Sequence, residues 1–160
     1  MIEENNIPKI INSGIVDVKF GSNVIIVNPV NLYGCKIDDD CFVGPFVEIQ
    51  KRVSIGKKTK IQSHAFICEL VTIGDNCFIS HGVMFINDLF KIGGPACGDQ
   101  TLWKHTEIGD HVSIGTNSTI LPVKIVNHVV IGAGSVVTKD ILEPGIYAGN
   151  PARKIGNKQE

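Results

Sequence analysis

This sequence of 160 residues has little in it that would point to a membrane, a nucleic acid or an export route. No apolar stretch is long enough to cross a bilayer. The start, MIEENNIPK, has no basic region followed by an apolar run, so no secretory signal is expected. A net charge of −1 gives no reason to expect nucleic-acid binding. We therefore expect one cytoplasmic domain with neither a membrane nor a nucleic-acid partner.

The cysteines are few and carry no metal signature. There are five of them, an odd number without a close CxxC pair, and no Cys/His spacing matches a zinc site. Reduced thiols in a cytoplasmic protein are the simplest interpretation, with Cys41 and Cys77 as small packing residues. No metal is predicted.

What the sequence does contain is an aliphatic or aromatic residue at every sixth position. A six-residue period fits neither an α-helix nor a hairpin meander, and short fixed periods indicate a solenoid. Each repeat is expected to form one short strand whose apolar residue faces a shared axis, so that residues one coil apart stack in columns. The series is Ile37, Val43, Ile49, Ile55, Ile61, Ile67, Ile73, Ile79 and Phe85.

The period returns after an interruption. Ile108, Ile114 and Ile120 are on register, and a second run follows after one residue is lost beside Pro122. An insertion of about seventeen residues separates Phe85 from Ile108. Long loops within compact repeats are uncommon and usually functional. The predicted layout of the single domain 1–160 is opening strands 1–30, coils 31–85, loop 86–106, coils 107–138 and a C-terminal tail 139–160.

The repeats suggest a family. The hexads IGKKTK, IGDNCF, IGDHVS and IGAGSV, with the ending VVTKDILEPGIYAGNPARKIG, resemble hexapeptide-repeat acyltransferases. The segment KIQSHAFICELVTIGDNCFISHGVMFIND, followed by GGPACGDQTLWKHTEIG, is similar to bacterial enzymes that acetylate the 3-amino group of a nucleotide-linked sugar. The resemblance implies an all-β, left-handed parallel β-helix with one long protruding loop. It also implies acetyl-CoA as co-substrate and a homotrimer with active sites between subunits.

Three hexads form one triangular coil in this family, so residues eighteen apart are expected to be vertical neighbours about 4.8 Å apart. After correction for the insertion and for the missing residue, two edges of the prism collect polar or small residues. The first edge is predicted to carry Ser63, His64, His81, Gly82, Thr116, Asn117, Ala133 and Gly134. The second edge is predicted to carry Lys51, Glu69 and Asn87, with the long loop leaving just above.

The first edge is interpreted as the coenzyme groove. Ala133 and Gly134 are small enough for close approach to the backbone, where the resemblance places the pantetheine arm. The thioester is expected to point down the edge toward Asn117 and His81, with Thr116 and Asn117 among the residues that bind the coenzyme. The basic residues near the C-terminus suit the phosphates of CoA; they are Lys139, Arg153 and Lys154. The alternative is that the glycines are turn residues and the basic tail is a solvated end.

His81 is the candidate general base, because amine acetylation requires a neutral amine and histidine has a suitable unperturbed pKa. His64 is predicted to orient His81 or to hold the sugar. The alternative is that both are exposed corner residues without a role. The galactoside and maltose acetyltransferases carry a catalytic His inside the loop, whereas the stretch from Asn87 to Phe90 has none. Either His81 replaces it, or the enzyme has no dedicated base and the thiolate itself takes the proton.

Asn87 is the second candidate, because the resemblance places an active-site Asn at this point. Its amide suits the acetyl oxygen as that becomes an oxyanion, or the sugar amine. Glu69 is predicted beneath it, to bind the amine or polarise Asn87, and Asp88 is a candidate for a sugar hydroxyl. The alternative for Asn87 is a turn residue that launches the loop.

The loop narrows the choice of sugar. Relatives that act on a 3-amino uronic acid have a loop arginine suited to a carboxylate, whereas this loop has none and offers Leu89, Phe90 and Ile92. We therefore expect a dTDP-3-amino-3,6-dideoxyhexose, used for O-antigen or surface-layer glycans, with Phe90 a candidate for stacking. The alternatives are a UDP-linked amino sugar, a non-catalytic trimeric scaffold, and a carbonic-anhydrase-like relative that holds a metal near His64 and His81.

Overall fold

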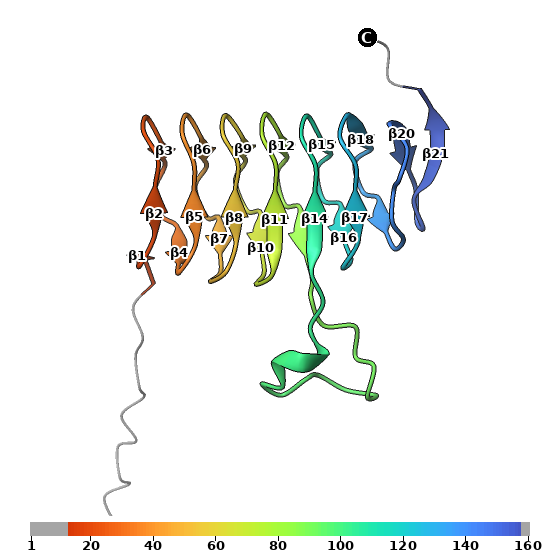
Figure 1. The fold of residues 1–160 in the computed structure, drawn as a ribbon, viewed down its shortest axis with the longest axis horizontal. Helices are drawn as coiled ribbons and strands as arrows, with labels where there is room; N and C mark the ends of the chain where they lie inside the picture. The colour runs from red at the N-terminus through yellow and green to blue at the C-terminus, as the bar shows by residue number, and fades with distance from the viewer. Residues whose placement is uncertain (1–12, 158–160) are drawn as a thin grey trace, which may run out of the picture.

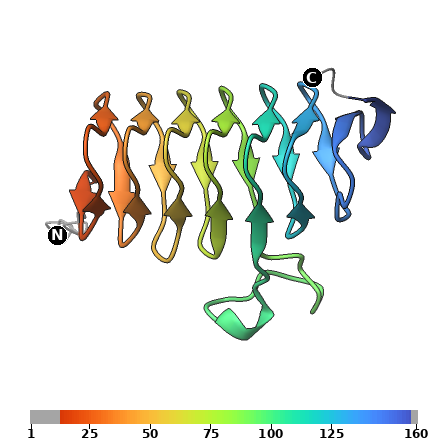
Figure 2. The ribbon, with the colours of Figure 1, turned by 45° about the horizontal axis from the view of Figure 1, so that its top comes forward.

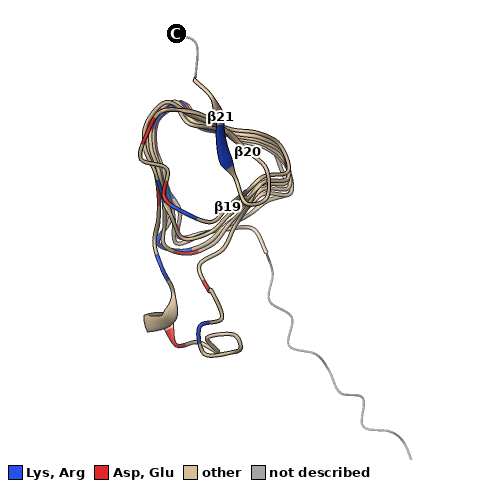
Figure 3. Ribbon diagram, turned by 90° about the vertical axis from the view of Figure 1, so that its right-hand side faces the viewer, with Lys and Arg blue, Asp and Glu red and all other residues tan. Residues whose placement is uncertain are grey.

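The computed structural model describes residues 13–157. The interpretation of the first nine residues, and the outer parts of the opening strands and of the tail, lie outside the described residues. The described chain winds into a solenoid with three sides (Figures 1 and 3). Buried apolar side chains fill its centre. Its strands form three sheets, and the fold is the left-handed β-helix that the family resemblance implies.

Each sheet stacks one short strand from every coil, and all pairs within the coils are parallel. Sheet A contains β1 (Ile15–Val16), β4 (Asn31–Tyr33), β7 (Glu48–Ile49), β10 (Phe66–Ile67), β13 (Met84–Phe85), β16 (Thr119–Ile120) and β19 (Val136–Val137). Sheet B contains β2 (Lys19–Phe20), β5 (Lys36–Ile37), β8 (Ser54–Ile55), β11 (Val71–Ile73), β14 (Thr106–Ile108) and β17 (Lys124–Ile125). Sheet C contains β3 (Ile25–Ile26), β6 (Phe42–Val43), β9 (Lys60–Ile61), β12 (Phe78–Ile79), β15 (Ser113–Ile114), β18 (Val129–Ile131), β20 (Gly145–Ala148) and β21 (Arg153–Gly156).

The six-residue series forms the core, as the period predicts. From Ile37 to Phe85 every member of the series is at most 1% exposed, and Ile120 and Ile131 continue the columns at 0% and 1%. Fully burying one such side chain contributes about 1.5–3 kcal/mol. The stacked aliphatic columns therefore dominate the stability of the fold.

The register explains where the period holds and where it slips. Phe66 pairs with Met84, eighteen residues on, as expected for three hexads per coil. Glu107 pairs with Lys124, seventeen residues on, which confirms the missing residue beside Pro122. The same shortening occurs early in the chain, where Ile15 pairs with Leu32. Asn31 also pairs with Glu48, seventeen residues on, so the first two described coils are each one residue short, and the eighteen-residue register begins where Lys36 pairs with Ser54.

The recurring Ile-Gly-Asp sequence has a packing cause at the third edge, between sheets B and C. The Asp75 carboxylate accepts a hydrogen bond from the Lys57 backbone N–H at 2.7 Å, and Asp110 accepts one from the Asp75 N–H at 2.8 Å. A Cβ at Gly56 or Gly74 would lie 2.4 or 2.3 Å from these carboxylate oxygens. Glycine is required because the side chain of the next coil fills that space.

The long loop leaves the prism between β13 and β14 and stands well clear of the coils (Figure 2). It contains the short 3-10 helix η1 (Gln100–Leu102). The predicted loop boundary at 106 is one residue too late, because Thr106 already belongs to β14. The tail contains two strands, β20 and β21, which pair as an antiparallel hairpin at the C-terminal end. Within residues 13–157 no helix is long and apolar enough to span a membrane.

Candidate active site

His81 is held on the first edge, the corner between sheets C and A. It follows β12, and its Nδ1 lies 2.8 Å from the Ser63 hydroxyl of the coil below. The Ser63 carbonyl also accepts a hydrogen bond from the Gly82 N–H at 3.0 Å. The predicted stacking of Ser63 under His81 is therefore confirmed. The His81 ring is exposed and fixed in direction at one nitrogen.

The neighbouring column of this edge has a gap at Gly82. Below the gap, the His64 ring stacks on Phe46 with centroids 4.9 Å apart, and the hydrogen bonds of the described residues include none between His64 and His81. Above it, the Asn117 amide lies over Gly82, where a Cβ would be 2.3 Å from Asn117 Oδ1. Gly82 has a φ of +64°, a conformation in which glycine is least strained. The Asn117 amide therefore occupies the space above Gly82, the residue that follows His81.

The upper part of the first edge is open, as the coenzyme interpretation requires. The Asn117 N–H donates to the His81 carbonyl at 2.9 Å, and the Gly134 N–H donates to the Thr116 carbonyl at 2.8 Å. Thr116 Oγ1 is occupied, since it lies 2.8 Å from Ser80 Oγ. Ala133 and Gly134 are exposed, and a Cβ at Gly134 would meet nothing within 4 Å.

The C-terminal tail contacts the last coil at the same edge. The Gly149 N–H donates to Ser135 Oγ at 3.1 Å, and the Ala152 N–H donates to the Val136 carbonyl at 2.8 Å. Arg153 follows directly, exposed on β21. The basic tail and the open backbone of Ala133 are thus brought to one corner.

The other two predicted phosphate ligands are placed differently. Lys154 Nζ forms an ion pair with the Glu143 carboxylate at 3.2 Å. Lys139 lies just past β19, at the corner between sheets A and B, so within one chain it does not lie with Arg153 on the first edge. The six-residue period ends at Val137, so it does not predict which edge the residues beyond Val137 occupy.

Asn87 lies on the second edge, two residues after the end of β13. Its Nδ2 donates to the backbone carbonyl of Glu69 at 3.2 Å, which confirms the predicted column. The Glu69 carboxylate, however, does not contact Asn87. It pairs with Lys51 at 3.7 Å and accepts a hydrogen bond from Arg52 Nε at 3.0 Å. Its side chain is only 9% exposed, so both cations compensate a nearly buried charge.

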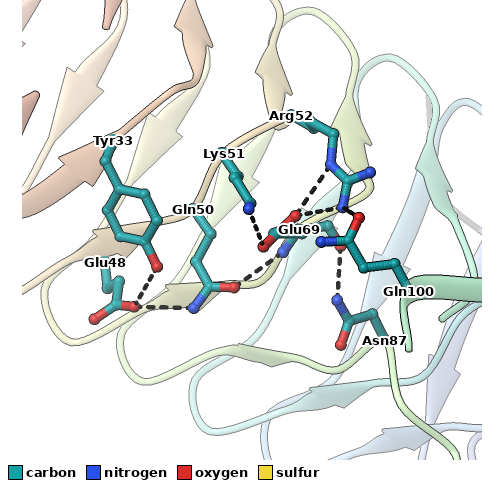
Figure 4. A network of polar contacts seen from close by, with 8 residues as sticks. All are labelled: Tyr33, Glu48, Gln50, Lys51, Arg52, Glu69, Asn87 and Gln100. Atoms are coloured by element: carbon teal, nitrogen blue, oxygen red, sulfur yellow. Dashed lines mark hydrogen bonds and ion pairs between the residues drawn. The ribbon is translucent and has the colours of Figure 1, made fainter. Parts of the chain in front are cut away.

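Arg52 and Gln100 were not predicted, and both belong to this cluster (Figure 4). Arg52 Nη2 contacts the Glu69 carboxylate and also donates to Gln100 Oε1 of the loop at 3.0 Å. Arg52 had a signal in the sequence, because it follows Lys51 on the same edge and has the reach for a diagonal contact. Gln100 had none, because the loop has no period.

The loop is organised by Asp88. One carboxylate oxygen accepts from the Phe90 N–H at 2.9 Å and the other from the Ala96 N–H at 2.7 Å. Asp88 thereby joins the two ends of an eight-residue span. Phe90 and Ile92 are 60% and 65% exposed, so the loop presents apolar side chains outward.

Two repeat models match the chain in the regions that form the coils. Residues 34–69 match the bacterial transferase hexapeptide of six repeats, and residues 105–139 match the hexapeptide repeat of succinyl-transferase. The chain is a hexapeptide-repeat protein. The two matches lie on either side of the long loop, which neither includes. Together with the solved structures described next, they support the hexapeptide-repeat acetyltransferase family.

Two of the similar solved structures are acyl-group transferases by name. An N-acyltransferase from Bacillus cereus, AntD, solved as a mutant in complex with dTDP and coenzyme A, is 26% identical with a TM-score of 0.67; the match covers 88% of this chain and 84% of that one. A maltose O-acetyltransferase from Clostridium difficile is 25% identical with a TM-score of 0.59, covering 89% and 67%. The bifunctional protein GlmU of Clostridium botulinum is 35% identical over 142 residues. That match covers 82% of this chain, but the chain spans only 30% of GlmU.

Proposed function

We propose that the chain is an acetyl-CoA-dependent N-acetyltransferase that acts on the 3-amino group of a nucleotide-linked dideoxy amino sugar, with dTDP-3-amino-3,6-dideoxyhexose as the substrate. The observation that carries the proposal is the position of His81. Its ring is fixed by Ser63 on an exposed edge, and the two coils above it present the Asn117 amide and the open backbone of Gly134. This arrangement suits a base at the end of a groove for a long, thin coenzyme.

The proposed reaction balances without a further reagent. The neutral sugar amine attacks the thioester carbonyl, a C–N bond forms, the C–S bond breaks, and CoA leaves as its thiolate. His81 Nε2 takes the proton from the amine and returns it to the thiolate. For Nε2 to accept a proton, Nδ1 must carry one and donate it to Ser63 Oγ. In this tautomer Ser63 Oγ acts as the acceptor of the Nδ1 proton.

Asn87 is proposed to bind the acetyl oxygen or the amine. One N–H of its amide is used on the Glu69 carbonyl, and the other N–H and Oδ1 remain available for a substrate. In one chain, however, the whole of β13 separates His81 from Asn87. Six residues of extended chain span about 20 Å, so both side chains cannot contact one amine unless two copies share the site.

The polarity of the outer faces supports such sharing. The outward positions of sheets A and C include Phe66, Met84 and Phe78, and the last two are each 40% exposed. The outward positions of sheet B are polar or charged; they are Lys19, Lys36, Ser54, Thr72, Glu107 and Lys124. We propose a homotrimer in which sheet A of each copy faces the threefold axis, so that the first edge of one copy meets the second edge of the next, while sheet B faces solvent.

The choice of sugar rests on two observations. AntD, which binds dTDP and coenzyme A, aligns over most of its length with this chain. The loop also presents Phe90 and Ile92 outward and has no arginine, which suits a 6-deoxy sugar better than a uronate. A role in O-antigen or surface-layer glycan synthesis would follow from that substrate.

The test is a thiol-release assay with acetyl-CoA and a panel of acceptors. The panel contains dTDP- and UDP-linked 3-amino and 4-amino sugars, with serine and maltose added because serine and maltose acetyltransferases are among the similar structures. We expect turnover with the dTDP-linked 3-amino-3,6-dideoxy sugars. Turnover with a UDP-linked sugar alone would replace the nucleotide assignment. No turnover, and no thermal shift at saturating acetyl-CoA, would refute the enzyme and favour a scaffold.

The His81→Asn variant tests the base. We expect kcat to fall by about a hundredfold or more with KM for acetyl-CoA little changed. His128→Asn is the matched control, because His128 is an exposed histidine that stacks on His111 at the third edge, 4.9 Å between centroids. Near-normal kcat in His81→Asn would favour the mechanism without a base.

Subunit mixing tests whether two copies share one site. His81→Asn and Asn87→Ala are unfolded together at equal amounts and refolded. If each site takes His81 from one chain and Asn87 from a neighbour, random trimers regain about a quarter of wild-type activity. If both residues act within one chain, no mixture regains activity, because every chain lacks one of them.

A further inference from the structure

The loop is attached to the prism at the second edge through a chain of polar contacts (Figure 4). Arg52 lies in the turn between β7 and β8, one coil below Glu69. Its Nε donates to Glu69 Oε2 at 3.0 Å, its Nη2 contacts the same oxygen, and Nη2 also donates to Gln100 Oε1 at 3.0 Å. A single guanidinium therefore joins the coils to the return arm of the loop.

The backbone of Glu69 is held by hydrogen bonds as well as its carboxylate. Its backbone N–H donates to Gln50 Oε1 at 3.2 Å, and its backbone carbonyl accepts from Asn87 Nδ2 at 3.2 Å. The outgoing arm of the loop is thus attached through Asn87. The Asn87 carbonyl accepts from the Lys104 N–H at 3.0 Å, which ties the two arms to each other at the base.

We propose that Arg52 is the positioning residue that holds the long loop on the second edge and thereby orients Asn87. The Asn87 side chain depends on the Glu69 carbonyl, Glu69 depends on Arg52, and Arg52 also holds Gln100. The part concerning Asn87 rests on the proposed function. The part concerning the loop does not.

The chemistry of the cluster requires arginine at this position. The Glu69 side chain is 9% exposed, whereas Arg52 is 44% exposed and reaches inward from the turn. A guanidinium offers several N–H groups in a rigid plane, so it can serve a carboxylate and an amide oxygen together. Lys51, at 3.7 Å from Glu69, compensates charge but has no contact with the loop among the bonds and ion pairs of the described residues.

The first experiment follows the loop without any assay of activity. Trypsin cleaves after Lys91 in the loop, and mass spectrometry identifies the two fragments that end and begin there. Loss of a charge-assisted hydrogen bond is expected to raise the population of the open loop, and so the cleavage rate, about tenfold in Arg52→Ala. Gln100→Ala removes only the loop contact and leaves the Arg52–Glu69 pair in place, so it should raise cleavage comparably at unchanged Tm.

Two further variants separate this role from a loss of charge or of stability. Lys57→Ala removes a cation that pairs with Asp39 at 2.9 Å on the third edge, and its loop should be cleaved at the wild-type rate. Arg52→Lys keeps the charge but not the fork, so cleavage should lie between wild type and Arg52→Ala. If Arg52→Ala does not fold, Arg52→Lys and Gln100→Ala still decide the question. Cleavage of both at the rate of Lys57→Ala would overturn the proposal.

The second experiment measures steady-state kinetics of the same variants. Misplacement of Asn87 should raise KM for the amino sugar and lower kcat about tenfold in Arg52→Ala, with KM for acetyl-CoA unchanged and partial recovery in Arg52→Lys. Faster loop cleavage with unchanged kinetics would overturn the link to Asn87. If no acceptor is acetylated by wild type, the proposed function fails, and the cleavage result still stands on its own.

Discussion

A buried hydroxyl at the root of the loop offers the sharpest test of the packing. Thr106 begins β14, where the chain re-enters the prism, and is 1% exposed. Its Oγ1 is buried and has no hydrogen-bond partner among the residues that the structure describes. Its neighbours in the same inward column are Val71 below, 1% exposed, and Val123 above, 5% exposed. Thr106 therefore occupies an apolar position of the column, where both neighbouring coils have valine.

The expected gain follows from this environment. In the unfolded chain the hydroxyl is hydrogen-bonded to water, and an unsatisfied buried polar group costs about 1–3 kcal/mol. Valine has nearly the same shape, so Thr106→Val should create neither a cavity nor a clash. We expect an increase of about 1–2 kcal/mol in the free energy of unfolding, or roughly 2–8 °C in Tm for a chain of this size.

The assay is urea unfolding, followed by circular dichroism at one fixed protein concentration because assembly makes stability concentration-dependent. The matched variant is Val71→Thr, which places a second hydroxyl in the same column and should lower the free energy of unfolding by a similar amount. If Thr106→Val is neutral or destabilising while Val71→Thr is destabilising, the assignment of Thr106 as unsatisfied is wrong.

Two other predictions concern the thiols and the first edge. Cys35, Cys41, Cys68 and Cys77 are buried and Cys97 is exposed, so Ellman's reagent should titrate one thiol in the native protein and about five in denaturant; two or more in the native protein would contradict this burial. Burial raises the pKa of Cys35 and Cys77 from 9.0 to about 11 and that of Cys68 to about 12, so the stability that these thiols contribute is complete below pH 9 and is lost as pH rises toward 11 and 12. The urea midpoint should therefore fall between pH 8 and about pH 10.5. Gly82→Ala should lower Tm more than Gly134→Ala, because both have positive φ (+64° and +66°) but only the Cβ at Gly82 meets Asn117 Oδ1, at 2.3 Å; equal losses of Tm in thermal melts would contradict the contact.

Much of the candidate site was computable because the repeat fixes the rise and the turn of each coil. The stacking of Ser63 under His81 and of Glu69 under Asn87 follows from counting eighteen residues, and both contacts are present. The counting continued to work across the loop, up to Gly134. It stopped where the period stops: Lys139 was chosen as a phosphate ligand by its charge alone, and it lies at the corner between sheets A and B.

Side-chain direction was a second limit. Counting places Glu69 in the column of Lys51 and Asn87 but does not say where its carboxylate points. In the structure the carboxylate turns back to Arg52, one residue off the column, because a nearly buried charge requires a close cationic partner. The backbone carbonyl, and not the carboxylate, is what Asn87 contacts.

The sequence by itself determined the prism, its core and the columns of its edges. A fixed period sets which side chains face the axis and which residues of the adjacent coils stack on them. The tertiary structure alone decided how the loop returns to the second edge and how the tail reaches the first. Neither segment repeats, so their positions depend on single contacts such as Arg52 to Gln100 and Gly149 to Ser135. Those contacts join residues that no spacing in the chain relates.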